Sequence, residues 1–533
     1  MKKILSVLTV CMIAMTAAAV PARRGPITRT AEDGTKKTVF LHGDAFSHHM
    51  TDEAGNWLDE ETLQPMSAEQ RAQREQHNMA RAKVRRVQQE KQIGGALNLA
   101  PRGLLIMVNF ANKAFVTPVD TIHQMINGET FTRSYKYDYQ YEYEGKTYTE
   151  HVDVKSSGSA RQYFHDTSWG QYNPQFDVVG PYTLSQSYAY YGKNDDENVG
   201  YMIKEACQLA DADGVDFTLY DNDNDGKVDF VYVLYAGYGE ADGGPSNTVW
   251  PHNYDLRYMG VSCTVDGKAV RNYACSNEIS YYSKLYNGIG TFCHEFSHVL
   301  GLPDLYETNQ TLKGLHTLLE WDILDYGPYN NDGNTPPAYS AYERFYMGWL
   351  TPRVLKDPEY IRLNPLNDSQ EALLLCEGDE HNLVGNDPKP TTFYLVECRT
   401  QTGWDQYLPG KGMLITKIKY NSSNWANNTV NNSTNNMGVD IMEAKANTSD
   451  YSNAKDAFPA GAKSWTEFTD HEITAIALQS DGVVKFSYRG GTDDQAVELV
   501  DDGATATKVL RDGQVLIIRG DKVYDLNGRQ LER

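Results

Sequence analysis

Three residues in the middle of the chain have the spacing of a metal site. His294, Glu295 and His298 lie within the string His-Glu-Phe-Ser-His. On an α-helix, positions four apart share one face, so both imidazoles can reach a single ion. Glu295 lies next to them, where its carboxylate can take a proton from a metal-bound water. The pattern predicts a zinc site that activates water, with Glu295 as the general base.

A third ligand is expected six residues after His298, at Asp304. Gly301 can adopt a positive φ and turn the chain back, and Pro303 prevents the helix from resuming. A catalytic zinc site uses three protein ligands and keeps one position open for water. His316 and Glu320 are the alternative third ligands.

A second cluster of oxygen ligands lies at residues 221–229, which read Asp-Asn-Asp-Asn-Asp-Gly-Lys-Val-Asp. Carboxylates at positions one, three, five and nine, with glycine at six and a main-chain carbonyl at seven, can surround one hard cation. The predicted calcium ligands are Asp221, Asp223, Asp225, Lys227 (through its carbonyl) and Asp229. Tyr232 stands where an EF-hand requires glutamate, so this is a calcium loop without that architecture. The alternative is an acidic turn.

The elements around these residues alternate between strands and helices. The run 103–110 is continuously apolar and predicts a buried strand, as does 230–236. Helices are expected at 199–212, from about Thr291 with its hydroxyl as N-cap, and at 338–349. This order predicts an α+β catalytic domain over residues 101–350.

The segments on either side have a different texture. Residues 351–490 predict a β-rich domain, and 491–533 a linker followed by a small C-terminal segment. Residues 1–22 have the basic start, apolar run and small-residue exit of a signal peptide. Residues 23–100 read as a prosegment that ends in a polar, exposed helix at 67–92.

Composition limits the partners and the compartment. The 533 residues carry a net charge of −22, which argues against a nucleic-acid-binding surface. No segment after the signal is long and apolar enough for a membrane span. Six cysteines follow Cys11, too few for a disulfide framework in a secreted chain of this size. A bridge between Cys263 and Cys275 stays open, because a turn at Asp266–Gly267 would place Cys263 opposite Val270.

Several strings together resemble one family. HEFSHVLGLPDLY (294–306), WDILDYG (321–327), SARQYFHDTSWGQYNPQFDVVGP (159–181) and FYLVECRTQTGWDQYLPGKGMLI (393–415) are similar to immune inhibitor A-type zinc metallopeptidases of family M6. The resemblance covers roughly 100–490. It implies a zincin-like, metzincin-like catalytic domain of a secreted bacterial type, with His294, His298 and Asp304 as zinc ligands and Glu295 as base.

The resemblance also implies roles for two residues beyond the ligands. Tyr326 matches a tyrosine that stabilises the tetrahedral intermediate in related enzymes, the alternative being an ordinary packed tyrosine. Leu324 stands where such enzymes place a methionine beneath the metal. Because the two side chains have similar volumes, we expect the packing there to survive the change.

The expected function is secreted, zinc-dependent endopeptidase activity on proteins or peptides, with calcium as a structural ion. The alternatives are a zinc hydrolase of peptidoglycan or glycan amides, and an inactive calcium-stabilised adhesin. The prosegment contains no cysteine, so His48, His49, Asp44 or Asp52 are candidates for blocking the metal. The last residues resemble C-terminal sorting segments and predict contact with a secretion machinery.

Overall fold

The computed structural model describes residues 19–31, 34, 36–84, 100–308, 315–446 and 453–492, and four strands near the C-terminus. The predicted signal peptide lies outside the described residues up to position 18, as does 85–92 of the predicted polar helix. Among the described residues, no helix is long and apolar enough to cross a membrane.

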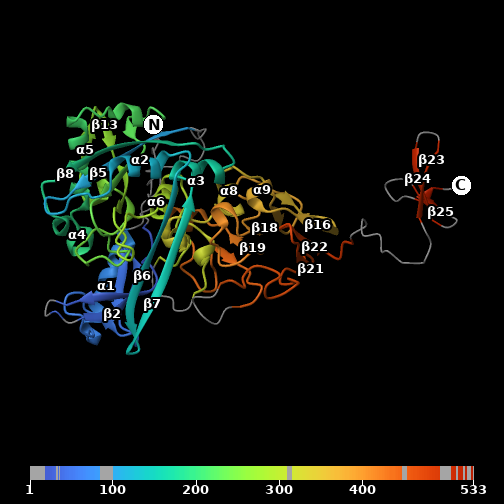
Figure 1. Ribbon diagram of the computed structural model, residues 1–533, viewed down its shortest axis with the longest axis horizontal. Coiled ribbons are helices and arrows are strands. Elements are labelled where there is room, and N and C mark those ends of the chain that lie inside the picture. Colours follow the sequence, from blue (N-terminus) through green and yellow to red (C-terminus); the bar gives the residue numbers. More distant parts are fainter. Residues whose placement is uncertain are drawn as a thin grey trace, which may run out of the picture.

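A five-stranded, mostly parallel sheet organises the catalytic region (Figure 1). Its order is β11 (His252–Asp255), β14 (Asn272–Asn277), β10 (Val231–Tyr235), β5 (Arg102–Asn109) and β8 (Gln175–Thr183). The apolar run predicted as a buried strand forms β5, which pairs in parallel with β8 and β10. Only β11, at one edge of this sheet, runs antiparallel to its neighbour.

Helices cover both faces of this sheet. Successive residues of a strand point to opposite faces, so an apolar strand supplies side chains to a core on each side. Leu105 and Met107 lie in one core cluster with Phe296 of the helix α6, and Ile106 lies in the other with Met202 of α5. These and the remaining helices of the region are α2 (Val119–Asn127), α3 (Ala160–Thr167), α4 (Tyr188–Asp196), α5 (Val199–Ala212), α6 (Gly290–Val299), α7 (Asn330–Gly333) and α8 (Ala341–Tyr346). The sheet and α6 therefore share one apolar core.

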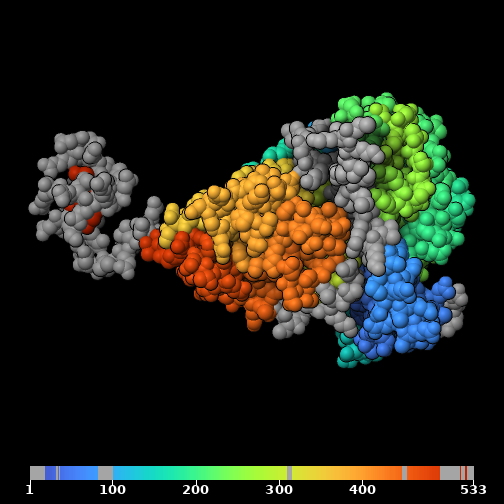
Figure 2. Space-filling model, turned by 180° about the vertical axis from the view of Figure 1, so that it is seen from behind, coloured from blue at the N-terminus to red at the C-terminus, as the bar shows by residue number. Residues whose placement is uncertain are grey.

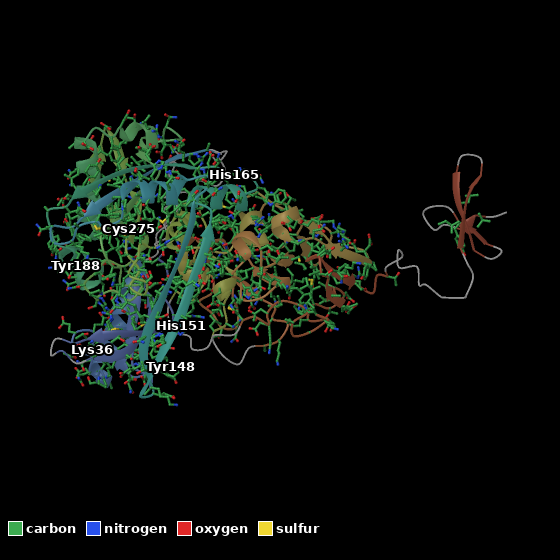
Figure 3. The ribbon with its side chains drawn as sticks, viewed as in Figure 1. Lys36, Tyr148, His151, His165, Tyr188 and Cys275 are labelled. Atoms are coloured by element: carbon green, nitrogen blue, oxygen red, sulfur yellow. The ribbon has the colours of Figure 1, made fainter. Side chains whose placement is uncertain are left out.

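Two smaller β units also belong to the region. A small sheet contains β9 (Lys227–Val228), β12 (Cys263–Val265) and β13 (Lys268–Val270), with Cys263 opposite Val270. A long hairpin consists of β6 (Thr132–Tyr143) and β7 (Lys146–Ser157). Figure 3 labels Tyr148 and His151 on this hairpin, which extends beside the N-terminal sheet.

The N-terminal segment folds against the catalytic region (Figure 2). Its strands are β1 (Pro26–Thr30), β2 (Lys36–Asp44), β3 (Ser47–Thr51) and β4 (Trp57–Leu58), followed by α1 (Ala68–Val84). The helix is largely exposed, as its polar sequence predicts, but it is not free of the domain. Arg81 Nη1 lies 3.1 Å from Asp195 Oδ2, and His77 Nε2 lies 2.6 Å from the same atom.

Strands dominate after residue 350. The elements are β15 (Arg353–Val354), β16 (Glu359–Leu363), α9 (Leu366–Ser369), β17 (Leu373–Leu375), β18 (Thr392–Arg399), β19 (Gly412–Lys419), α10 (Ser422–Ala426), β20 (Val439–Ile441), β21 (Ile473–Leu478) and β22 (Val484–Tyr488). A separate sheet contains β23 (Ala506–Arg511), β24 (Gln514–Arg519), β25 (Lys522–Tyr524) and β26 (Gln530–Leu531). The chain is thus a mixed α/β protein.

Candidate metal centre

The helix α6 carries the motif and is held close to a neighbouring loop. A Cβ on Gly290 would lie 1.9 Å from the carbonyl oxygen of Pro328, and one on Gly288 would lie 2.0 Å from that of Gly333. Glycine is therefore required at both positions. The predicted hydroxyl cap at Thr291 is wrong: the helix begins at Gly290, with Ile289 at the N-cap and no side-chain cap.

Three predicted ligand atoms converge beside α6. His294 Nε2 and His298 Nε2 are 3.2 Å apart, and each lies 3.3 Å from Asp304 Oδ1. All three side chains are buried. Gly301, with φ of 97°, makes the turn that brings Asp304 back to the helix.

These distances between ligand atoms fit tetrahedral coordination of one metal ion. Ligand atoms about 2.0–2.1 Å from zinc in a tetrahedral arrangement stand about 3.3–3.4 Å apart. Asp304 Oδ1 is buried and accepts no hydrogen bond among the described residues. Burial opposes ionisation of Asp304, but the two imidazoles hold its pKa well below the usual value. The donor set therefore fits a zinc ion with one open position.

Main-chain carbonyls fix the orientation of both imidazoles. His294 Nδ1 is 2.7 Å from the carbonyl oxygen of Ile323, and His298 Nδ1 is 2.8 Å from that of Leu302. A carbonyl can only accept, so each Nδ1 donates and each Nε2 presents its lone pair to the shared space.

Asp304 is positioned by a residue that the sequence did not indicate. Asn428 Nδ2 donates to Asp304 Oδ2 at 2.6 Å, and Asn428 Oδ1 accepts from the Asp304 amide at 2.7 Å. Asn428 follows α10, in the region after residue 350. It lies 124 residues from Asp304 in an Asn-rich loop, so no local pattern sets it apart.

We expect Asn428→Ala to weaken zinc binding by about 10- to 100-fold, the usual effect of removing a residue that orients a metal ligand. Competition with a chromogenic chelator measures this affinity. Asn427→Ala is the matched control, because the Asn427 amide donates to Ser423 instead. Equal zinc affinity in both variants would contradict the role of Asn428.

Glu295 lies in the same buried space. Its Oε1 accepts a hydrogen bond from the main-chain N–H of Val20 at 2.8 Å, while its buried Oε2 has no partner among the described residues. Burial raises the pKa of Glu295 to about 8, with the charge of His294 opposing. A carboxyl with a raised pKa beside a metal site can both take up and return a proton.

The alternative third ligands lie elsewhere. His316 Nε2 is 3.1 Å from Asp456 Oδ2 and 3.4 Å from Glu443 Oε1. Glu320 Oε2 accepts from Asn453 Nδ2 at 2.7 Å. Neither side chain belongs to the cluster of ligand atoms formed by the two histidines of α6 and Asp304.

Leu324 and Tyr326 lie on the turn that supports His294. Leu324 is fully buried in the same apolar cluster as α6, next to the residue whose carbonyl accepts from His294. The ring of Tyr326 is covered by the guanidinium of Arg24, 3.7 Å from the ring centroid. Its role with a tetrahedral intermediate stays a prediction.

Tyr306 is a second phenol at the site, and we made no sequence-based prediction for it. Its hydroxyl donates to the carbonyl oxygen of Ala19 at 2.5 Å and lies 3.0 Å from Asp44 Oδ2. Tyr306 is two residues beyond Asp304, so the turn that delivers the carboxylate also delivers this hydroxyl.

The predicted prosegment blockers have different surroundings. Asp44 Oδ2 lies 3.0 Å from the Tyr306 hydroxyl. His48 Nε2 is 3.3 Å from Asp195 Oδ1, His49 stacks on Trp57, and Asp52 accepts from its own turn. The group on Glu295 is instead the backbone of Val20.

The predicted calcium loop gathers part of its ligand set. Asp221, Asp223 and Asp225 offer carboxylate oxygens within 4.8 Å of one another. Lys268 Nζ lies 2.6 Å from Asp221 Oδ2, so an ammonium group already neutralises part of this charge. Asp229 Oδ2 accepts from the Asn222 amide and side chain at 2.7 Å. Calcium binding stays a prediction.

If the loop binds calcium, the ion should raise the melting temperature before it affects hydrolysis, because a ligand that binds only the folded state stabilises it by mass action. The double variant Asp223→Ala, Asp225→Ala should lose the response. Melting temperature is measured against calcium concentration in both proteins. Identical calcium responses would show that the ion does not bind at this loop.

This arrangement of ligand atoms is the kind expected in a metallopeptidase, and the sequence comparisons agree with that class. Residues 98–350 match the profile of the immune inhibitor A peptidase M6 catalytic domain. The chain is 29% identical over 217 residues to the pre-pro-metalloprotease PrtV of Vibrio cholerae serotype O1, covering 36% of this chain and 23% of that protein. It is 24% identical over 217 residues to immune inhibitor A of Bacillus thuringiensis subsp. alesti, covering 35% of this chain and 31% of that protein.

Residues 98–350 are thus similar to the catalytic domain of the immune inhibitor A-like M6 metallopeptidases. The chain's matches span about a quarter to a third of the length of these curated relatives.

Proposed function

We propose that the protein is a secreted, zinc-dependent endopeptidase that hydrolyses internal peptide bonds of proteins. One observation carries the proposal: a main-chain N–H, that of Val20, donates to Glu295 Oε1 beside three converging ligand atoms. A peptide group therefore fits next to the candidate base.

The proposed roles follow from the chemistry of each group. A zinc ion held by His294, His298 and Asp304 would supply Lewis acidity to a water and to the substrate carbonyl. Glu295 takes the proton from the water and gives it to the departing amine. Tyr326, and independently Tyr306, are the candidates for donating to the carbonyl oxygen as its charge develops.

The rival functions predict other results. A hydrolase of peptidoglycan or glycan amides would cut those substrates instead, and a calcium-stabilised adhesin would cut neither. The antiparallel edge strand β11 and the extended peptide beside Glu295 favour a polypeptide substrate.

The test uses the secreted chain after its leader has been removed by limited proteolysis. The enzyme is incubated with an unfolded protein and, separately, with peptidoglycan, each with and without a zinc chelator. Chelator-sensitive cleavage of the protein alone supports the proposal, and cleavage of peptidoglycan alone overturns it.

The proposal also predicts that the N-terminal leader keeps the enzyme inactive until it is removed. We expect the full secreted chain to be at least about tenfold less active than a form beginning near Arg102, because the leader that follows the predicted signal cut still places Arg23 against Asp242 and Asp332 and Arg24 over the ring of Tyr326. Limited proteolysis with N-terminal sequencing, followed by a peptide assay over time, measures this. The same digestion of Glu295→Gln controls for the added protease.

Sequencing the untreated chain also locates the signal boundary. A cut before Val20 leaves its amine on Glu295, whereas a cut after Ala22, as the 1–22 boundary predicts, removes this contact. Full activity before digestion, with no rise as the leader is lost, would make residues 23–100 a folding aid rather than an inhibitor.

A further inference from the structure

The chain's own N-terminal segment lies along the candidate active site as an extended peptide. Residues 19–22 are buried. The Ala19 carbonyl accepts from Tyr306, the Val20 amide donates to Glu295, and the Val20 carbonyl accepts from Trp250 Nε1 at 3.0 Å. Three successive main-chain groups are thus bonded to side chains of the catalytic domain.

Further main-chain hydrogen bonds hold the next residues of the segment. The Pro21 carbonyl accepts from the Tyr329 hydroxyl at 2.6 Å. The Arg23 amide donates to the Ala241 carbonyl at 2.8 Å. Backbone hydrogen bonds of this kind hold a peptide irrespective of its sequence, and side-chain pockets then supply the selectivity.

The contacts at Glu295 and Tyr306 define a register. In the proposed mechanism, Glu295 gives its proton to the departing amine, and here it bonds to the Val20 nitrogen. The carbonyl just before that nitrogen, that of Ala19, accepts from Tyr306. The Ala19–Val20 bond therefore occupies the place of the bond to be cleaved, and Arg23 is the fourth residue on the leaving-group side.

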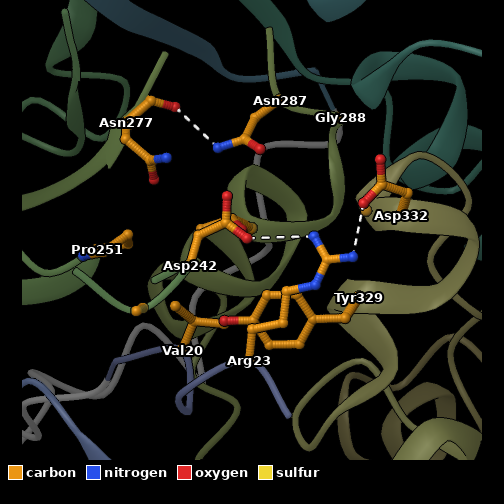
Figure 4. Close-up of a pocket in the computed structure, with 12 residues that line it drawn as sticks. Val20, Arg23, Asp242, Pro251, Asn277, Asn287, Gly288, Tyr329 and Asp332 are labelled. Atoms are coloured by element: carbon orange, nitrogen blue, oxygen red, sulfur yellow. Dashed lines mark hydrogen bonds and ion pairs between the residues drawn. The ribbon is translucent and has the colours of Figure 1, made fainter. Parts of the chain in front are cut away.

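The side chain of Arg23 lies among acidic and aromatic side chains, and it lines a pocket together with Asp242, Asp332 and Tyr329 (Figure 4). Nη1 lies 3.2 Å from Asp242 Oδ1, and Nη2 lies 2.6 Å from Asp332 Oδ1. The guanidinium also stacks over the ring of Tyr282, 4.0 Å from its centroid. Two carboxylates and an aromatic face surround the cation.

Both carboxylates belong to the domain and are withdrawn from water. The side chains of Asp242 and Asp332 are 8% and 1% exposed. Asp332 accepts from the hydroxyls of Tyr135 and Tyr137 on the long hairpin, and Asp242 accepts from the amide of Tyr281. When the segment leaves, the two neighbouring acids lose their counter-charge, and a second cation at the same place would restore the ion pairs.

We infer that Asp242, Asp332 and Tyr282 form a substrate subsite for a basic side chain, arginine above all, in the fourth residue after the cleaved bond. The position of the subsite relative to the cleaved bond rests on the proposed function. The subsite itself rests on the observed ion pairs of Arg23 with Asp242 and Asp332. The substrate class is polypeptides with arginine or lysine at that distance from the cut. Arginine is preferred because its planar fork meets both carboxylates at once.

The test uses the secreted chain after limited proteolysis of its leader. Three peptides share one sequence and differ only in the fourth residue after the cleaved bond: arginine, its neutral isostere citrulline, and aspartate. We expect kcat/KM to be about 10- to 100-fold higher for arginine than for citrulline, as charge-assisted hydrogen bonds imply, and lowest for aspartate. In the double variant Asp242→Asn, Asp332→Asn, the ratio of kcat/KM for the arginine peptide to that for the citrulline peptide should fall to about one.

Asp138→Asn is the control, since Asp138 lies on the exposed hairpin and should keep the preference. Equal kcat/KM for the arginine and citrulline peptides in the wild type would overturn the subsite and leave the endopeptidase proposal standing. If no peptide is hydrolysed, that proposal fails, and calorimetric binding of the same peptides decides the subsite. Tighter binding of the arginine peptide, lost in the double variant, supports it; equal binding overturns it.

Discussion

Glu295→Gln should abolish hydrolysis and leave the metal bound. The amide nearly matches the carboxylate in shape, and its oxygen can still accept from a substrate N–H. It cannot take a proton from water or return one to the leaving amine. General acid–base catalysis by a positioned side chain contributes typically 10²- to 10⁴-fold, so we expect a loss on that order in kcat.

The measurement combines metal analysis with turnover on one preparation of the leader-free protein. Glu295→Asp is the companion variant: it keeps a carboxylate but withdraws it by one methylene, so activity should be reduced and not absent. Thermal unfolding of both variants checks that the fold is intact. Wild-type turnover in Glu295→Gln would refute its role as base.

Asp304→Ala should remove the metal, and the activity with it. The variant leaves two imidazoles where zinc is normally held by three protein ligands, and it strands the amide of Asn428 that now donates to the carboxylate. We expect less than about a tenth of an equivalent of zinc after dialysis, with turnover at the level of the chelated wild type.

Two further variants make this test discriminating. His316→Ala and Glu320→Ala remove the alternative third ligands, which contact Asp456 and Asn453 instead of the two histidines. Both should retain zinc. Retention by Asp304→Ala, together with loss in either of the others, would transfer the ligand role.

The sequence predicted what is encoded locally. His294, His298, Glu295 and Asp304 fall within eleven residues, so the helix period and one glycine turn suffice to bring them together. The helix α5 spans Val199–Ala212 as predicted, because its apolar positions recur with the helical period. The turn at Asp266–Gly267 likewise set the pairing of Cys263 with Val270.

Contacts between distant segments could not be predicted in this way. Asn428 is 124 residues from Asp304, to which it hydrogen-bonds, and Val20 is 275 residues from Glu295. The position of Arg23 between Asp242 and Asp332 depends on three segments that only the fold assembles. The start of α6 was predicted to within one residue, but its hydroxyl cap was not found, and Gly290 instead allows the close approach of the Pro328 loop.

Titration of the metal-free, leader-free chain with zinc, with peptide hydrolysis followed at each addition, tests the central claim most directly. The account predicts no turnover without metal, a linear rise to one equivalent and a plateau thereafter. Full turnover in the metal-free chain, or no turnover at any zinc concentration, would contradict it.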